Sequence, residues 1–234
     1  MKKNSNSQLT PKELPKSYFN EKFYTQTLDE YQINFRNAIF DKQKKIVICD
    51  ARAGTGKTTI ALGAADLLIK YHQYEHIYYV IAPVQEQKQG FLPGDLAQKS
   101  APYMSPLYTA LRKLGINAYT CVTNEETEMY KDSDYYICTI PHTFLRGNTL
   151  SNSIVIVEEA QNYYVDELKK VLTRVDDSCK TIVIGHSGQV DLTSNPQNSG
   201  LKRCVELFKN EDQAAVCKLV KNYRGWVSLT ADNL

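Results

Sequence analysis

The segment CDARAGTGKTTIALGAA, residues 49–65, decides the fold because an apolar run, a glycine-containing turn and a helical pattern follow one another there. Glycines in such a turn let backbone N–H groups point inward around phosphate oxygens, and the lysine that follows reaches the β- and γ-phosphates. The helix that begins at the turn favours negative charge at its N-terminus. The segment predicts a phosphate-binding loop made of Ala51, Arg52, Ala53, Gly54, Thr55, Gly56, Lys57, Thr58 and Thr59.

The first position of this loop departs from the usual pattern. Glycine ordinarily stands there, and this chain has Ala51. Alanine is tolerated if the residue does not need a positive φ, the region that favours glycine. Lys57 and Thr58 keep the pair that contacts phosphate and Mg²⁺. We therefore expect a nucleotide site rather than the alternative, an ordinary strand–helix turn.

The composition is that of a globular protein. The chain has 234 residues, of which 42% are hydrophobic and 23% charged, enough for one good core. A net charge of +2 does not by itself indicate nucleic acid, so any such surface would be a local patch. No apolar run approaches the roughly 18 residues that cross a membrane, and no apolar segment follows the N-terminal lysines as in a secretory signal. With six scattered cysteines, these features predict reduced thiols and a cytoplasmic protein.

Short β-rich runs alternate with longer helical ones along most of the chain. Continuous apolar runs predict strands at 45–50, 77–82, 135–140, 153–158 and 181–186. Helices are expected at 57–71, 97–114, 164–175 and 201–209. This alternation indicates an α/β fold, a parallel sheet with helices on both faces. The polar, lysine-rich residues 1–25 predict a flexible arm, and residues 26–234 a single domain.

Two acidic residues follow the fourth predicted strand, at the end of the sheet where ligands bind in such folds. In nucleotide-hydrolysing sites the first acid of such a pair, here Glu158, holds Mg²⁺ together with the loop hydroxyl of Thr58. The second, Glu159, orients or deprotonates the attacking water. The metal position is usually Asp, so Glu158 carries an extra methylene. The alternative is an acidic helix start that complements the helix dipole.

A glutamine, Gln189, follows the fifth predicted strand within GHSGQVDL, residues 185–192. Placed beside the metal-binding strand, it would be able to contact the γ-phosphate. The alternative is a Gly/Ser turn with incidental polar residues. The two motifs described above favour the phosphate-contacting role.

Five segments of the chain form a recognisable set. In order they are ARAGTGKTT (51–59), GFLPGDLAQKSAPYMSPLYTAL (90–111), FLRGNTL (144–150), VIVEEAQN (155–162) and GHSGQVDL. Together they resemble the PhoH-like ATPase family, relatives of superfamily 1 helicases. The resemblance covers roughly residues 28–226 and implies a RecA-like P-loop NTPase that binds and hydrolyses ATP with Mg²⁺, with RNA as the expected polymer.

The resemblance also assigns roles to single positions. Those that match the family's motifs are Lys57 and Thr58 as the P-loop pair, Glu159 as the catalytic acid and Gln189 as the γ-phosphate glutamine. Three positions differ: Ala51 stands for Gly, Glu158 for the metal Asp, and His186 for the Asp that follows Gly185 in the family.

Two further residues fit a helicase-like protein. Gln32 lies on an expected helix 25 residues before Lys57 and resembles the glutamine that reads adenine, since an amide both donates and accepts. Arg224, in LVKNYRGW, resembles an arginine that approaches the γ-phosphate. The alternatives are a surface helix glutamine and a surface arginine packed beside Trp226.

In two-domain helicases, the motif that LVKNYRGW resembles begins the second motor domain. In this chain about ten residues follow Arg224. Arg224 would therefore either fold back onto its own site or complete the site of a neighbouring subunit. The sequence favours the second arrangement, a homo-oligomer in the form of a hexameric ring.

Candidate contacts to single-stranded nucleic acid, RNA more than DNA, are Lys88 and Phe91, because cations bind phosphates and aromatic rings stack on bases. The aromatic residues of this segment could equally belong to the core. Arg146, on a loop after the third strand, suits either a phosphate contact or a subunit interface.

The sequence thus predicts an ATPase coupled to binding or unwinding of single-stranded RNA or DNA. A rival hypothesis is a nucleotide-binding switch or scaffold with little or no hydrolysis, favoured by the substitutions at Ala51, Glu158 and His186. A small-molecule kinase is a third possibility. It is disfavoured because no Arg-rich, lid-like insertion is visible in the sequence.

Overall fold

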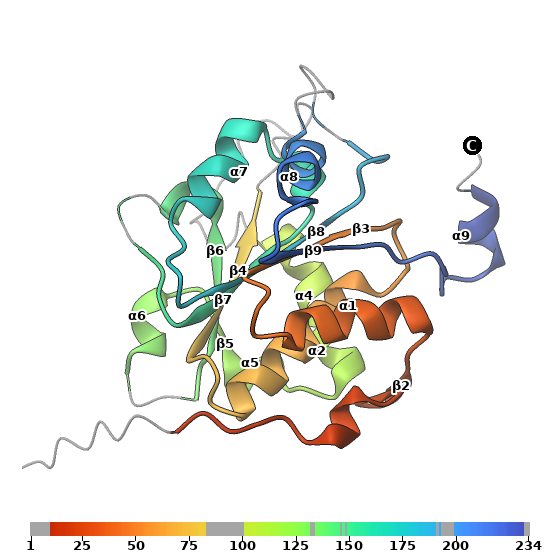
Figure 1. Ribbon diagram of the computed structural model, residues 1–234. Coiled ribbons are helices and arrows are strands. Elements are labelled where there is room, and N and C mark those ends of the chain that lie inside the picture. The colour runs from red at the N-terminus through yellow and green to blue at the C-terminus, as the bar shows by residue number, and fades with distance from the viewer. Residues whose placement is uncertain are drawn as a thin grey trace, which may run out of the picture.

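A seven-stranded sheet forms the centre of the protein (Figure 1). The structure is a computed structural model that describes residues 10–82, 101–131, 134–145, 147, 149–190, 192 and 199–231. The strands follow the order β5-β6-β4-β7-β8-β3-β9, and every neighbouring pair is parallel. Their bounds are β3 (Ile46–Asp50), β4 (His76–Ile81), β5 (Val122–Thr123), β6 (Ile137–Pro141), β7 (Ser153–Val157), β8 (Lys180–Gly185) and β9 (Ala214–Cys217).

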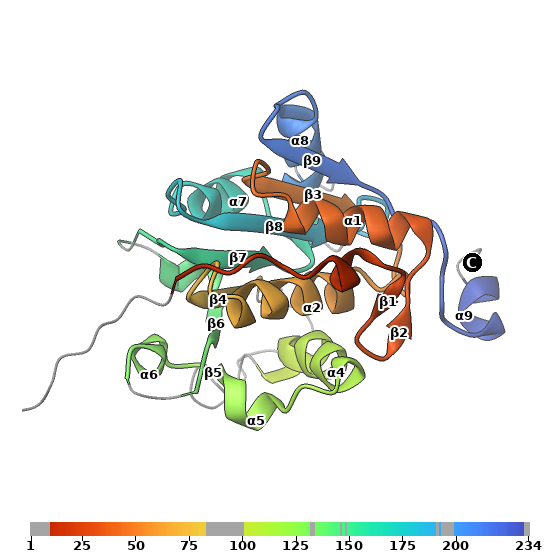
Figure 2. The ribbon, with the colours of Figure 1, turned by 60° about the horizontal axis from the view of Figure 1, so that its bottom comes forward.

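Helices cover both faces of this sheet (Figures 1 and 2). One face packs against α1 (Glu30–Phe40), α2 (Lys57–Lys70) and α4 (Ser105–Leu114), and the other against α7 (Val165–Leu172) and α8 (Gly200–Phe208). Shorter elements are α5 (Ala118–Cys121), α6 (Glu126–Met129), α9 (Trp226–Ala231), η1 (Lys16–Phe19), η2 (Ala101–Met104), η3 (His142–Leu145) and η4 (Ala160–Asn162). None of the helices in the described part of the chain is long and apolar enough to cross a bilayer.

The strands are apolar on both sides because both sides are buried. In β3, Val47 and Cys49 join the core beneath α1 and α2, whereas Ile46 and Ile48 join the core beneath α7 and α8. Neighbouring tyrosines of β4 divide in the same way, with Tyr79 in the first core and Tyr78 in the second. This is the pattern that a parallel sheet with two covered faces requires.

The predicted fold class is confirmed. All five predicted strands are present within two residues of their expected bounds, as β3, β4, β6, β7 and β8. The sequence missed β5 and β9, which lie at the two edges of the sheet and have two and four residues. Such short runs carry too little periodicity to be recognised.

The segment before residue 25 is packed on the domain, beginning at Lys12, whose N–H donates to the Tyr71 carbonyl at 2.9 Å. A two-stranded hairpin, β1 (Lys22–Phe23) and β2 (Gln26–Thr27), follows η1. Phe23 is 1% exposed and lies on α2 where Gly63 leaves room, since a Cβ on that glycine would stand 2.7 Å from the ring. The buried guanidinium of Arg36 donates to the carbonyls of Phe19, at 2.8 Å, and Asn20. Residues 16–25, expected to belong to a flexible arm, are thus fixed to α1 and α2; residues 1–9 lie outside the described part.

Truncation of Phe23 tests whether this segment belongs to the folded unit. We expect Phe23→Ala to lower the free energy of unfolding by about 3–5 kcal/mol, because it leaves a cavity against α2. Urea unfolding followed by circular dichroism measures the change. Tyr119→Ala, at a side chain that is 92% exposed, is the control and should stay within about 0.5 kcal/mol of the parent. Equal stabilities for the two variants would show that the segment packs only loosely.

Candidate functional site

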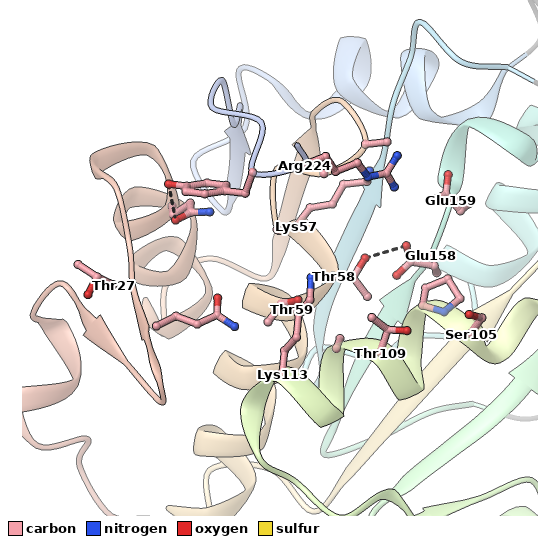
Figure 3. A pocket seen from close by; sticks show the side chains of 18 residues that line it. Thr27, Lys57, Thr58, Thr59, Ser105, Thr109, Lys113, Glu158, Glu159 and Arg224 are labelled. Atoms are coloured by element: carbon pink, nitrogen blue, oxygen red, sulfur yellow. Dashed lines mark hydrogen bonds between the residues drawn. The ribbon is translucent and has the colours of Figure 1, made fainter. Parts of the chain in front are cut away.

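A pocket of about 690 Å³ lies where the N-terminus of α2 meets the carboxyl ends of β3 and β7 (Figure 3). This volume is within the usual range for small-molecule and cofactor sites. Most of the residues that line it are polar or charged. The lining residues are Gln26, Thr27, Gln32, Ala53, Gly54, Gly56, Lys57, Thr58, Thr59, Ser105, Pro106, Thr109, Ala110, Lys113, Glu158, Glu159, Tyr223 and Arg224.

The predicted phosphate loop forms the floor of this pocket. Gly54 and Gly56 have φ values of +81° and +89°, which L side chains rarely adopt. Ala51 is different: among the described residues, the non-glycine positive φ values are at Tyr24, His72, Asn152 and Glu159. Ala51 instead extends the sheet, donating its N–H to the Gly185 carbonyl at 2.9 Å. Alanine in place of the first glycine is therefore compatible with the conformation of the loop.

Seven of the ten predicted nucleotide-binding residues line the pocket. The other three, Ala51, Arg52 and Thr55, lie outside the set of described residues that line it. Ala51 is buried, and Arg52 is exposed. The Thr55 hydroxyl donates to the Arg52 carbonyl at 2.9 Å, so both residues shape the turn rather than its inner surface.

The metal pair predicted from the sequence is in contact. The Thr58 hydroxyl, in the first turn of α2, donates to Oε1 of Glu158 at 3.0 Å (Figure 3). The second oxygen, Oε2, accepts from the hydroxyl of Tyr79 on β4 at 2.8 Å. Hydroxyl and carboxylate oxygens are ligands that Mg²⁺ prefers. The donor set at this point therefore fits such an ion.

Glu158 is 3% exposed, and its charge is held in the interior. Burial, followed by the nearby carboxylate of Glu159, raises the pKa of Glu158 to about 7, although Tyr79, Lys57 and Thr58 act in the opposite direction. Burial beside Glu158 also raises the pKa of the Tyr79 hydroxyl, which keeps its proton and remains a donor. A cation bound here would offset the cost of the buried charge.

Glu159 stands in a backbone conformation that favours glycine, with φ of 50° and ψ of 46°. Gln161, 1% exposed, donates its side-chain amide to Oε2 of Glu159. Its own Oε1 accepts the backbone N–H of His186 at 2.9 Å. The sequence did not single out Gln161, which connects the acid after β7 to the end of β8. Gln161 can bridge Glu159 and His186 only because β7 and β8 are neighbours in the sheet, and the sequence does not reveal this pairing.

The turn after β8 is bound to the end of β3. Ser187 donates its N–H to Oδ1 of Asp50 at 2.9 Å and its hydroxyl to Oδ2 at 2.6 Å. His186 stands where the resemblance predicts an aspartate. Its Nδ1 lies 3.8 Å from Oδ1 of Asp50. Gln189 is exposed and lies outside the set of described residues that line the pocket. Gln189 therefore does not line this pocket, and its contact with the γ-phosphate stays a prediction.

Gln32 is buried at the wall of the pocket rather than on the helix surface. Its Oε1 accepts the N–H of Asp29, and its Nε2 donates to the Thr55 carbonyl at 2.9 Å. The Asp29 side chain in turn accepts the Gln32 N–H at 2.9 Å, which completes a capping box at the start of α1. Gln32 thereby fixes α1 to the phosphate loop.

The segment after β9 returns to the same loop. Tyr223 donates its N–H to the Gly54 carbonyl at 2.9 Å and its hydroxyl to Oδ2 of Asp29 at 2.7 Å. Arg224 lines the pocket beside Lys57 (Figure 3). Its side chain crosses directly over Gly54, because a Cβ added to Gly54 would stand 2.7 Å from Cγ of Arg224. Glycine is thus needed at position 54 for two reasons: the backbone there has a positive φ, and the segment with Arg224 leaves no room for a side chain. Arg224 folds back onto the site of its own chain.

An outer wall of the pocket was missed at the sequence level. It is formed by α4 and by β2 of the hairpin, and the hydroxyl of Thr25, in the turn before β2, donates to the Lys113 carbonyl at 3.1 Å. Lys113 and Thr109 point from α4 toward the start of α2 (Figure 3). The sequence predicted a helix over these residues. Which side of that helix lines the pocket depends on how α4 packs against α2, which the sequence does not show. The predicted nucleic-acid residues Lys88, Phe91 and Arg146 lie outside the described residues.

Replacing the buried acid by Glu158→Gln should stabilise the protein above neutral pH. The pKa of Glu158 is higher in the folded chain, about 7, than its ordinary value of 4.5. Between these values the folded state binds more protons than the unfolded state, so its stability falls as pH rises through that window. We expect the variant to gain about 1–3 kcal/mol at pH 8 and little below pH 4.5. Urea unfolding in EDTA at both pH values checks this.

Glu206→Gln, on an exposed carboxylate of α8, is the control and should change stability by less than about 0.5 kcal/mol at either pH. A constant difference between Glu158→Gln and the parent across the range would show that Glu158 ionises equally easily in both states.

Known proteins share this fold. The chain is similar to the large terminase of a thermophilic bacteriophage, with a TM-score of 0.53 and 13% identity over 83% of this chain and 46% of that one. It is also similar to the Sulfolobus solfataricus SWI2/SNF2 ATPase core, with a TM-score of 0.50 and 15% identity over 86% of this chain and 47% of that one. Identities this low show the fold alone, which is that of RecA-like P-loop ATPases.

Sequence comparison is more specific. The chain is 37% identical to the PhoH-like protein of Synechocystis sp. over 175 residues, which are 74% of this chain and 51% of the relative. It is 34% identical to protein PhoH of Escherichia coli (strain K12) over 197 residues, 82% of this chain and 52% of the relative. The chain therefore spans about half the length of the curated relatives it matches. Residues 25–224 match the family model described as PhoH-like protein, and the chain belongs to the PhoH-like family.

Proposed function

We propose that the chain binds ATP with Mg²⁺ in this pocket and hydrolyses it. The observation that carries the proposal is the contact of 3.0 Å between Thr58 and Glu158, with Lys57 and Glu159 lining the same pocket. Phosphate-binding amides, a lysine, a hydroxyl–carboxylate pair and a second acid are the parts that P-loop hydrolases use. Membership of the PhoH-like family and the ATPase fold support the assignment.

In this proposal, different residues of the chain bind the phosphates, the metal ion, the attacking water and the adenine. The backbone amides of the phosphate loop and the ammonium of Lys57 hold the phosphates, and the N-terminus of α2 favours their charge. Thr58 and Glu158 would hold Mg²⁺, which when bound neutralises charge that develops on the phosphate oxygens. Glu159 accepts a proton from the attacking water, with its carboxylate oriented by Gln161. Gln32 contacts the adenine with the amide proton that it does not donate to Thr55.

Arg224 acts in its own subunit in this proposal. Its place in the pocket, beside the loop that Tyr223 contacts, supports action in cis rather than the ring arrangement favoured by the sequence. A cation there compensates charge on the γ-phosphate as hydrolysis proceeds. A homo-oligomer, including a hexameric ring, is compatible with this arrangement but is not needed to complete the site.

A polymer partner extends this function. We infer that ATP turnover is coupled to single-stranded nucleic acid, RNA more than DNA, in the cytoplasm. The SWI2/SNF2 core with the same fold was determined in complex with dsDNA, which supports a nucleic-acid partner for this architecture. Lys88, Phe91 and Arg146 remain the predicted contacts.

A switch or scaffold with slow hydrolysis is the second candidate. One observation favours it: both oxygens of the buried Glu158 already accept hydrogen bonds from the protein, which compensate part of its charge in the absence of a metal ion. The two candidates differ in turnover and not in ATP binding.

The decisive measurement is steady-state ATP hydrolysis with Mg²⁺, with and without single-stranded RNA or DNA. We expect turnover that rises with the polymer, and a loss of at least about 100-fold in Glu159→Gln, because the general base is removed. Glu159→Gln should still bind ATP, whereas Lys57→Ala should not bind it tightly. Tight ATP binding without turnover under any condition would favour the switch.

The position of Arg224 is tested by mixing variants. Arg224→Ala should retain ATP binding and lose turnover by at least about 100-fold, whereas Arg203→Ala, on the exposed face of α8, should behave as the parent. Because Arg224 serves its own pocket, mixing Arg224→Ala with Lys57→Ala subunits should restore nothing. Partial recovery of activity on mixing would show instead that the arginine completes a neighbouring site.

A further inference from the structure

The hydroxyl of Tyr79 occupies an unusual place in the interior of the protein. Tyr79 is fully buried on β4, the strand that pairs with β7, and lies opposite Ile156, two residues before Glu158. Its hydroxyl donates to Oε2 of Glu158 at 2.8 Å, while Oε1 of the same carboxylate accepts from Thr58 at 3.0 Å. The two hydrogen bonds approach Glu158 from different elements, β4 and α2, and together fix the plane of its carboxylate.

A glutamate needs such fixing more than an aspartate does. Its side chain has one more rotatable bond, and holding it in one conformation costs more conformational entropy. A carboxylate that binds a divalent cation is generally oriented by outer hydrogen bonds, whose removal weakens metal binding. An aspartate at this position would end about 1.5 Å closer to the backbone, one carbon–carbon bond less, and would not keep both partners with the backbone unchanged.

We propose that Tyr79 is a positioning residue that holds Glu158, which is one methylene longer than an aspartate, in the orientation needed for Mg²⁺. The inference rests on the proposed function, since it concerns the same metal site. A merely structural role is the contrasting explanation: a buried hydroxyl needs an acceptor, and Glu158 is within reach. The two explanations differ in whether the effect of Tyr79 depends on the length of the acid.

A double-mutant cycle separates them. The four proteins are the parent, Tyr79→Phe, Glu158→Asp and the double variant, and the readout is Mn²⁺ affinity measured by electron paramagnetic resonance with a non-hydrolysable ATP analogue. We expect Tyr79→Phe to weaken Mn²⁺ binding about tenfold in the parent. In the Glu158→Asp background the same change should have less than about a twofold effect. Equal effects in both backgrounds, or none in the parent, would overturn the proposal.

Tyr163→Phe is the matched control. Tyr163 is also fully buried, but its hydroxyl donates to the Val80 carbonyl at 3.2 Å and not to a carboxylate. Its removal should lower stability without changing Mn²⁺ affinity. If the Glu158→Asp proteins do not fold, a loss confined to Tyr79→Phe supports the proposal, and equal losses in Tyr79→Phe and Tyr163→Phe overturn it.

Binding of the ATP analogue to the parent in saturating Mg²⁺, measured first, keeps this test separate from the proposed function. A parent protein that does not bind the analogue would refute the proposed function and the inference with it. A parent that binds the analogue, with Mn²⁺ affinity insensitive to Tyr79, would refute the inference alone.

Discussion

The hydrogen bond from the Thr58 hydroxyl to Glu158 joins the two parts of the molecule on which the site depends, the phosphate loop at the start of α2 and the end of β7. It spans 100 positions of the chain, so it exists only because β8 alone separates β3 from β7 in the sheet. A buried carboxylate is costly unless hydrogen bonds or a cation compensate its charge. Hydrogen bonds from Tyr79 and Thr58 offset part of this cost, and a cation held by the same oxygen atoms would offset more of it.

The strand ends are further connected by side chains outside the set of described residues that line the pocket. Gln161 bridges the carboxylate of Glu159 and the backbone of His186, and Asp50 binds Ser187 across β3 and β8. A change at the phosphate loop can therefore reach the turn that carries Gln189 through direct contacts.

The segment after β9 adds a third connection, because Tyr223 contacts both the phosphate loop and the start of α1. It carries Arg224 into the pocket, and it continues into α9, where Trp226 and Val227 are largely exposed. Gly54 lies beneath the crossing, which explains why this loop position accepts no side chain. The arginine that a sequence motif could only suggest is thus held near the phosphate loop by the hydrogen bonds of Tyr223 to Gly54 and Asp29.

The sequence by itself determined the α/β class, the five inner strands and the phosphate loop, because these depend on local apolar runs and on the residues of one turn. It also indicated that Thr58 and Glu158 lie close together, since parallel strands end at one edge of the sheet. Only the tertiary structure decided that Tyr79 and Gln161 support the acids, that α4 and β2 close the pocket, and that Arg224 reaches its own site. Each of these depends on distances between segments far apart in the chain, which strand order and helix packing set and which no local pattern encodes.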